Sequence, residues 1–182
     1  MTSLNSRSAE TIAVRQLSVA DEFEFDNLAE QSDLDGLAAP HRGKLLRNGR
    51  VWAAVDPVSP QGRRFVGCCC ADRGVVRGYL DVRHQIHQLP LPNLYLCGAF
   101  VLPGYRGLGV GQTLYRTRLS WASSQVDLPI FVEINGNGKP FSVHPDALPG
   151  WRFHQRAGLD VIGYSVCPDR GPVLARPALR SP

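Results

Sequence analysis

The amino-acid sequence predicts an α/β domain that departs from a regular doubly wound fold. Apolar runs of strand length, such as 51–55 and 94–102, alternate with segments of helical pattern, such as 18–30 and 109–124. The expected order is strand, two helices, three strands, helix, strand, helix and two strands. Three consecutive strands are incompatible with the strict alternation of strands and helices in a doubly wound sheet.

Each element follows from its own pattern and its boundary residues. Ser18 is expected to cap the first helix, with Phe23, Leu28 and Ala29 as its buried stripe, and Gly158 is expected to end the last helix. The expected strands cover residues 12–17, 51–55, 64–71, 94–102, 129–135, 160–166 and 173–175, and the expected helices cover 18–30, 33–47, 109–124 and 151–157.

Two segments stand out among these elements. Residues 94–102 are apolar throughout, which is typical of a strand buried on both faces. Residues 72–93 are compatible with an extra strand, a short helix or a loop on the substrate side.

Length, composition and charge limit the classes of protein to which this chain can belong. The chain has 182 residues, of which 43% are hydrophobic and 20% charged, so we expect one domain over 11–176 with flexible tails at 1–10 and 177–182. The polar N-terminal segment and the absence of a long apolar run predict a cytoplasmic protein that does not bind membranes. The net charge is +4, but no basic run exceeds the pair Arg63–Arg64, so no nucleic-acid partner is expected.

The cysteines and histidines do not form a recognisable metal motif. Cys68, Cys69 and Cys70 are consecutive, and neighbouring side chains on a strand point to opposite faces, so the three cannot share one metal ion. We interpret all the cysteines as buried, reduced thiols. Asp81, His84 and His87 include only two histidines without a clear further ligand, so no metal is expected there either.

The glycine-rich segment 101–111 is the part of the sequence that most strongly indicates a ligand-binding site. An apolar strand runs into a turn with glycines at 107, 109 and 111, and the turn opens a helix. The first amides of a helix lack internal partners and carry partial positive charge, so they can bind a phosphate. The lysine of a P-loop and the glycine spacing of a dinucleotide fingerprint are both missing.

The spacing Val-x-Pro-x-x-Arg-Gly-x-Gly-x-Gly at 101–111 resembles the acyl-CoA loop of the GNAT acetyltransferase superfamily. The segment Phe-His-Gln-Arg-Ala-Gly-Leu at 153–159 resembles that family's late motif, and a strand at 130–134 lies between the two. The resemblance covers about residues 12–176. It implies a mixed, mostly antiparallel central sheet with flanking helices and a splayed cofactor cleft.

The resemblance also implies which residues bind acetyl-CoA or another acyl-CoA as co-substrate. Backbone groups of Phe100, Val101 and Leu102 would hold the pantetheine arm, and the Val101 amide would stabilise the oxyanion. Asn137 is a candidate for an asparagine that family members have before the last helix. The pyrophosphate would be bound by the amides of Arg106, Gly107, Leu108, Gly109, Val110, Gly111 and Gln112.

Two side chains are candidates for proton transfer. His154 occupies the position where the family often has a tyrosine that protonates the leaving thiolate, although a solvent-facing histidine without a role is the alternative. Glu133 is the one acid within the strand at 130–134 and is the candidate base, although an ordinary salt bridge would also explain it. His144 is a second candidate base, and Tyr115 and Tyr164 are other possible acids.

The expected function is therefore transfer of an acetyl group from acetyl-CoA to an amine by direct attack in a ternary complex. The acceptor is left open between a small molecule and a protein amine, as is a homodimer, which is frequent in the family. A non-catalytic acyl-CoA-binding regulator is the first alternative. An acyltransferase that uses a longer acyl chain or a hydroxyl acceptor is the second. The long segments 72–93 and 136–150 are expected to govern acceptor specificity.

Overall fold

The computed structural model describes residues 12–31, 39–48, 50–125, 127–135, 151–167 and 170–177. No helix in these ranges is both long enough and apolar enough to span a membrane. The strands are β1 (Ala13–Gln16), β2 (Arg50–Val55), β3 (Phe65–Arg73), β4 (Gly78–Leu80), β5 (Ile86–Gln88), β6 (Leu94–Val101), β7 (Ile130–Asn135), β8 (Asp160–Ser165) and β9 (Arg170–Arg176). The helices are the 3-10 helix η2 (Val19–Asp21), α1 (Glu22–Glu30), α2 (Ala39–Asn48), the 3-10 helix η4 (Pro103–Tyr105), α3 (Val110–Ser123) and α4 (Trp151–Arg156).

The strands form a mixed sheet, which confirms the predicted fold class. Their hydrogen-bonded order is β1-β2-β3-β6-β7-β9-β8-β4-β5. The strand β6 pairs with β7 in parallel, and the pairs β1–β2, β7–β9, β8–β9, β4–β8 and β4–β5 are antiparallel.

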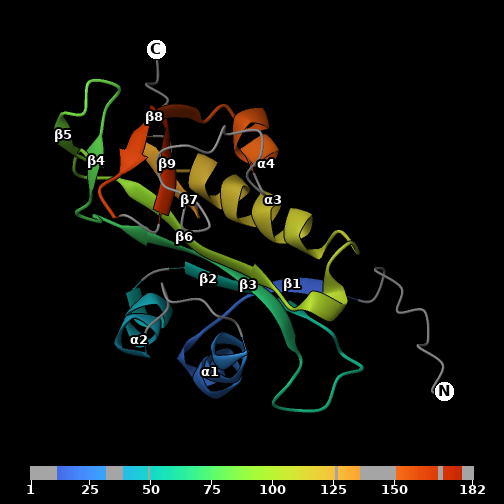
Figure 1. Ribbon diagram of the computed structural model, residues 1–182. Coiled ribbons are helices and arrows are strands. Elements are labelled where there is room, and N and C mark those ends of the chain that lie inside the picture. Colours follow the sequence, from blue (N-terminus) through green and yellow to red (C-terminus); the bar gives the residue numbers. More distant parts are fainter. Residues whose placement is uncertain are drawn as a thin grey trace. The chain divides into compact units, whose positions relative to one another are not determined.

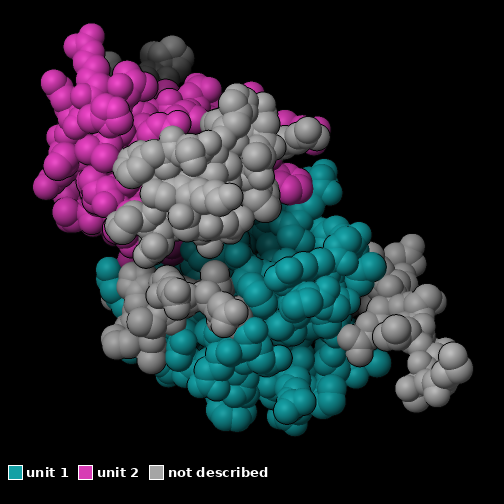
Figure 2. All heavy atoms as spheres, in the orientation of Figure 1, with its two compact units in different colours: residues 1–70, 98–118 teal, residues 71–97, 119–182 magenta. Residues whose placement is uncertain are grey.

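The described chain divides into two compact units, each built from two separate stretches (Figure 2). Unit 1 consists of residues 1–70 and 98–118, and unit 2 of residues 71–97 and 119–182. Both β6 and α3 contribute residues to each unit.

Unit 1 is layered around β1, β2 and the first part of β3. The helices α1 and α2 lie on one side of these strands, and the first half of α3 lies on the other (Figure 1). Cys69 faces α3, where its Sγ lies 3.3 Å from the Leu114 carbonyl oxygen. Cys68 and Cys70 therefore face the opposite layer, and all three thiols are buried and free. The remaining two cysteines, Cys97 and Cys167, are half-buried rather than buried as predicted.

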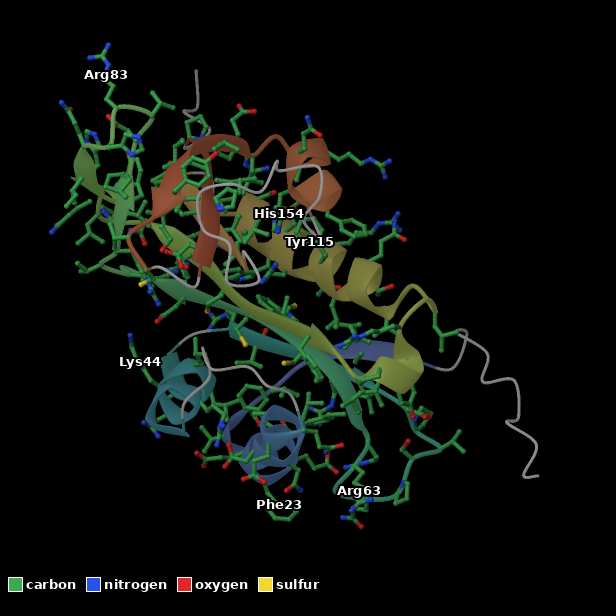
Figure 3. All side chains as sticks on the ribbon, viewed as in Figure 1. Phe23, Lys44, Arg63, Arg83, Tyr115 and His154 are labelled. Carbon is green, nitrogen blue, oxygen red and sulfur yellow. The ribbon has the colours of Figure 1, made fainter. Side chains whose placement is uncertain are left out.

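The predicted buried stripe of the first helix is wrong at one position. Phe23 is 72% exposed, whereas Phe25, Leu28 and Ala29 are buried. Phe23 extends away from the strands (Figure 3). Residues 25, 28 and 29 have the i, i+3, i+4 spacing of one helix face, and a residue two positions earlier lies about 200° around the helix.

Unit 2 contains the segment that the sequence left open. Residues 78–88 form a hairpin in which Tyr79 pairs with His87, and β4 continues the antiparallel pairing onto β8. A hydrophobic cluster in this unit contains the buried residues Leu89, Tyr95, Phe131 and Val173.

Two further predictions concern the end of α4 and the burial of β6. The helix α4 ends as predicted at Gly158, which has φ +73°, because the Leu159 amide donates to the His154 carbonyl oxygen as in a Schellman motif. The strand β6 is buried only over its first three residues, 94–96, so burial along the whole strand was wrong.

The beginning of the first helical segment is fixed by a charged capping arrangement. Ser18 is the N-cap of η2, as predicted, and its amide donates to the Asp21 carboxylate at 2.9 Å. The Arg15 guanidinium contacts the other oxygen of Asp21 at 2.6 Å. The hydrogen bond from Arg15, with further bonds from Ser18, lowers the pKa of Asp21 from its usual 3.8 to about 2.

The close approach of β8 to β4 generates the first prediction. A Cβ on Gly163 would lie 2.1 Å from the Leu80 carbonyl oxygen and 2.8 Å from Tyr79 Cδ2. We expect Gly163→Ala to lower the free energy of unfolding by about 3 kcal/mol, because backbone must move to admit the methyl group. Urea unfolding measures this effect. Gly104→Ala is the matched control, because its Cβ would meet nothing within 4 Å; an equal loss in both variants would contradict the steric argument.

The pKa of Asp21 generates the second prediction. Because the folded pKa lies below the unfolded one, the carboxylate stabilises the fold fully above about pH 4 and loses this effect as the pH falls toward 2. We therefore expect the stability difference between the wild type and Asp21→Asn to shrink between pH 5 and pH 3 in urea titrations. The same series in an Arg15→Gln background is expected to show a weaker pH dependence. A difference that does not vary with pH would refute this assignment.

Candidate functional site

The site begins where β6 leaves its parallel partner. The pairing of β6 with β7 runs from Leu94–Ile130 to Leu96–Val132, although β6 itself continues to Val101. Gly98 has φ +48°, a left-handed conformation that favours glycine and turns the strand at this point. The second half of β6 then belongs to unit 1.

In unit 1 this half of β6 is held tightly against β3. A Cβ on Gly67 would lie 2.8 Å from the Phe100 carbonyl oxygen, so the two backbones approach closely only because residue 67 is glycine. The Leu102 amide donates to the Val66 carbonyl oxygen at 2.9 Å. The side chains of Phe100, Val101 and Leu102 are half-buried.

The turn that follows orients Arg106. The Tyr105 amide donates to the Leu102 carbonyl oxygen, and the Arg106 amide donates to that of Pro103. Arg106 Nε also donates to the Val101 carbonyl oxygen at 3.1 Å, and the exposed guanidinium lies 6.0 Å from the centre of the Phe100 ring. The arginine is therefore tied by one nitrogen to the end of β6, and its cationic charge lies beside the loop.

The loop glycines are required by backbone conformation rather than by lack of space. Gly107 and Gly109 have φ +81° and +77°, and a Cβ on either would meet nothing within 4 Å. The loop is therefore open around these two glycines.

The start of α3 completes an anion-binding arrangement. The hydrogen-bond ladder of the helix starts with the Thr113 amide donating to the Gly109 carbonyl oxygen, so the ladder offers no acceptor to the amides of Val110, Gly111 and Gln112. The first turn contains no acidic residue that would neutralise the partial positive charge of the helix N-terminus. The amides at the start of α3 thus fit a pyrophosphate. The predicted role of the Arg106 amide is wrong, because this amide already donates to the Pro103 carbonyl oxygen, and only the guanidinium of Arg106 is left to contribute.

Glu133 lies in unit 2, in the middle of β7. It is half-buried, whereas its neighbours Val132 and Ile134 are buried, as the alternation of the strand predicted. Ser165 Oγ donates to Glu133 Oε1 at 3.1 Å, and Ser165 Oγ itself accepts a hydrogen bond from the Cys167 amide at 3.1 Å. Ser165 Oγ thus acts as an acceptor toward the Cys167 amide, and its single hydroxyl proton is donated to the Glu133 carboxylate. Sequence reasoning missed Ser165, since its contact spans 32 positions and has no local signal.

His154 also lies in unit 2, on α4 (Figure 3). It is only 8% exposed, so the alternative of a solvent-facing histidine is wrong. Tyr115 and Tyr164 are half-buried, and the Arg118 guanidinium lies 5.7 Å from the centre of the Tyr115 ring. Asn137 and His144 lie outside the described residues.

The polar residues of the β4–β5 hairpin bind one another. His87 Nε2 lies 2.8 Å from Asp81 Oδ2, and the His87 ring stacks on Tyr79. Hydrogen bonds from the Gln85 amide and His87 lower the pKa of Asp81. Within the ranges that the structure describes, no three His, Cys, Asp or Glu side chains are grouped to hold a metal ion.

Comparison with known proteins decides the family. Residues 20–158 match the profile of the Acetyltransferase (GNAT) family. The chain belongs to the GNAT acetyltransferase family. The matched range contains the predicted loop and the late motif up to Gly158, so the resemblance seen in the sequence is confirmed. A search of curated protein sequences finds no significant match.

Several solved structures share the fold at low sequence identity. NAA60 from Arabidopsis thaliana, crystallised with acetyl-CoA, is 13% identical and has a TM-score of 0.61; the alignment covers 91% of this chain and 98% of that one. A structure from Corynebacterium glutamicum, described as histone acetyltransferase HPA2 and related acetyltransferase, is 19% identical with a TM-score of 0.60, covering 94% and 98%. A NatC complex bound to Gag peptide and CoA contains a chain that is 16% identical with a TM-score of 0.61, covering 91% and 98%.

Proposed function

We propose that this GNAT protein transfers an acetyl group from acetyl-CoA to an amine by direct attack in a ternary complex. The proposal rests on the path of residues 98–112, with its three left-handed glycines, its helix N-terminus and the tethered Arg106. Such a path binds the pyrophosphate through backbone amides and one cation, without a lysine.

The remaining part of the cofactor is assigned to the end of β6. The pairing of β6 with β7 ends at Leu96, and the family resemblance assigns the pantetheine arm to backbone groups of residues 100–102. Both backbone groups of Leu102 already have partners, since its amide donates to the Val66 carbonyl oxygen and its carbonyl accepts the Tyr105 amide, so we assign the arm to Phe100 and Val101. The Val101 amide is proposed to stabilise the oxyanion that forms on the thioester carbonyl. Both roles use backbone groups, so they tolerate changes of side chain.

Proton transfer is assigned to Glu133 and His154. The nitrogen of the amine attacks the thioester carbonyl carbon, and the carbon–sulfur bond breaks. Glu133 takes the proton that the amine loses, and His154 gives a proton to the departing thiolate of CoA. The hydrogen bond from Ser165 supports this proposal, because it holds the Glu133 carboxylate in a fixed position on β7.

The first experiment tests cofactor binding by isothermal titration of acetyl-CoA. Gly109→Glu is expected to abolish binding, because it places a negative charge at the loop and forces a non-glycine residue to φ +77°. Gly74→Glu is the matched control: Gly74 has φ +65° and a Cβ there would meet nothing within 4 Å, but it lies in unit 2. Equal binding by the Gly109 variant and the wild type would refute the proposed loop function.

The second experiment tests the acid and the base. Release of CoA thiol is followed with small amines, amino acids, aminoglycosides and peptide amines as acceptors. Glu133→Gln and His154→Gln are each expected to lower kcat by about 100-fold while acetyl-CoA affinity is retained. If neither substitution slows turnover, the assignments are wrong. A protein that binds acetyl-CoA and acetylates none of the acceptors would be the regulator described above, and turnover with hydroxyl acceptors or longer acyl chains would favour the other alternative.

A further inference from the structure

A buried carboxylate at the end of β2 forms the centre of a polar cluster in unit 1. Asp56 is 3% exposed and follows the last residue of the strand. Its Oδ1 accepts the Val58 amide at 3.0 Å, and its Oδ2 accepts the Ser59 hydroxyl at 3.0 Å. The Asp56 amide donates to the Arg64 carbonyl oxygen, which closes the turn between β2 and β3. These bonds make the carboxylate a fixed part of a rigid turn.

The same carboxylate also binds the cofactor loop. The Tyr105 hydroxyl donates to Asp56 Oδ2 at 2.7 Å, across 49 positions of sequence, and lies 3.2 Å from Ser59 Oγ. Tyr105 is 7% exposed, so this contact is shielded from water. A hydrogen bond to a charged acceptor is stronger than one between neutral groups, and shielding preserves that strength.

Tyr105 directly precedes the glycine loop in the chain. It is the last residue of η4, and Arg106 and the left-handed Gly107 follow it directly. The turn is also attached to β3 through the Leu102 amide and to β6 through Arg106 Nε. The Asp56–Tyr105 bond is thus a third attachment, made from the side of the β2–β3 turn.

We propose that Asp56 and Tyr105 are positioning residues for the CoA loop. Their buried hydrogen bond fixes the turn at 103–106, so that Arg106 and the amides from Gly107 to Gln112 are arranged for the pyrophosphate before CoA arrives. The benefit is a smaller ordering cost on binding, which appears directly as affinity. This inference rests on the proposed binding of acetyl-CoA, and it adds residues that the family motif does not assign.

The decisive variant is Tyr105→Phe, because it keeps the ring in place and leaves the bonds of Asp56 to Val58 and Ser59. We expect a folded protein whose acetyl-CoA dissociation constant rises by about 10-fold in isothermal titration. In the ligand-free protein, the amide resonances of Gly107 and Gly109 are expected to shift and to show increased backbone mobility by nitrogen-15 relaxation, whereas the Gly163 resonance stays unchanged. A role in stability alone would move the unfolding midpoint and leave both readouts of the folded protein unchanged.

Tyr95→Phe is the matched control. Tyr95 is also buried, at 3% exposure, but it belongs to the core of unit 2. We expect its acetyl-CoA dissociation constant to equal that of the wild type even if its unfolding midpoint falls.

A double-mutant cycle tests whether Asp56 and Tyr105 act as one contact. Asp56→Asn is expected to weaken acetyl-CoA binding, and adding Tyr105→Phe to it is expected to weaken binding little further. Losses that multiply would overturn the inference, as would an unchanged dissociation constant in Tyr105→Phe. If the wild type itself fails to bind acetyl-CoA, the proposed function falls together with this inference. If the wild type binds and Tyr105→Phe binds equally well, only this inference falls.

Discussion

The backbone path from Gly98 to Val110 is the constraint on which the proposed function depends. Within this stretch the chain leaves a strand, adopts a left-handed conformation at three glycines and enters a helix. The groups that it presents are mostly amides, and the arginine beside them is tied to the same backbone. A site of this kind places few demands on side chains, which accords with a fold shared at 13% to 19% identity with NAA60 and the Corynebacterium glutamicum structure.

Glycine serves this fold for two different physical reasons. At Gly107 and Gly109 the backbone has a positive φ and the space for a side chain is open. At Gly67 and Gly163 a neighbouring carbonyl oxygen occupies the place of the Cβ. The first pair shapes a surface that can accept a ligand, whereas the second pair lets neighbouring strands approach. The sequence motif contains only the first kind, because close approach between distant segments leaves no local pattern.

Much of the fold was predictable from local patterns. The long strands, the helix after the glycine loop and the C-terminal cap at Gly158 all have signals within a few residues of the element itself. The two short strands of the β4–β5 hairpin did not, because three-residue strands are too short to show a period. The choice between Phe23 and Phe25 did have a local signal, because only Phe25 has the i, i+3, i+4 spacing with Leu28 and Ala29, and the prediction of Phe23 did not follow it.

Within the candidate site, too, some residues were predictable from the sequence and others were not. The loop residues were predictable because their role belongs to the backbone and to one contiguous motif. The hydrogen bonds from Ser165 to Glu133 and from Tyr105 to Asp56 join residues that are 32 and 49 positions apart, so they become visible only in the folded chain. Side chains that position a group are therefore harder to predict than the group itself.

The interleaving of the two units has a consequence for how the chain folds during synthesis. Unit 1 requires residues 98–118, which leave the ribosome only after residues 71–97 of unit 2. Neither unit can be completed from one continuous stretch, so folding of the N-terminal half must wait for a segment made much later. A single cut between any two of these stretches divides at least one unit between two fragments. The protein is therefore expected to resist division into independently expressed fragments, in contrast to chains whose compact units follow one another in sequence.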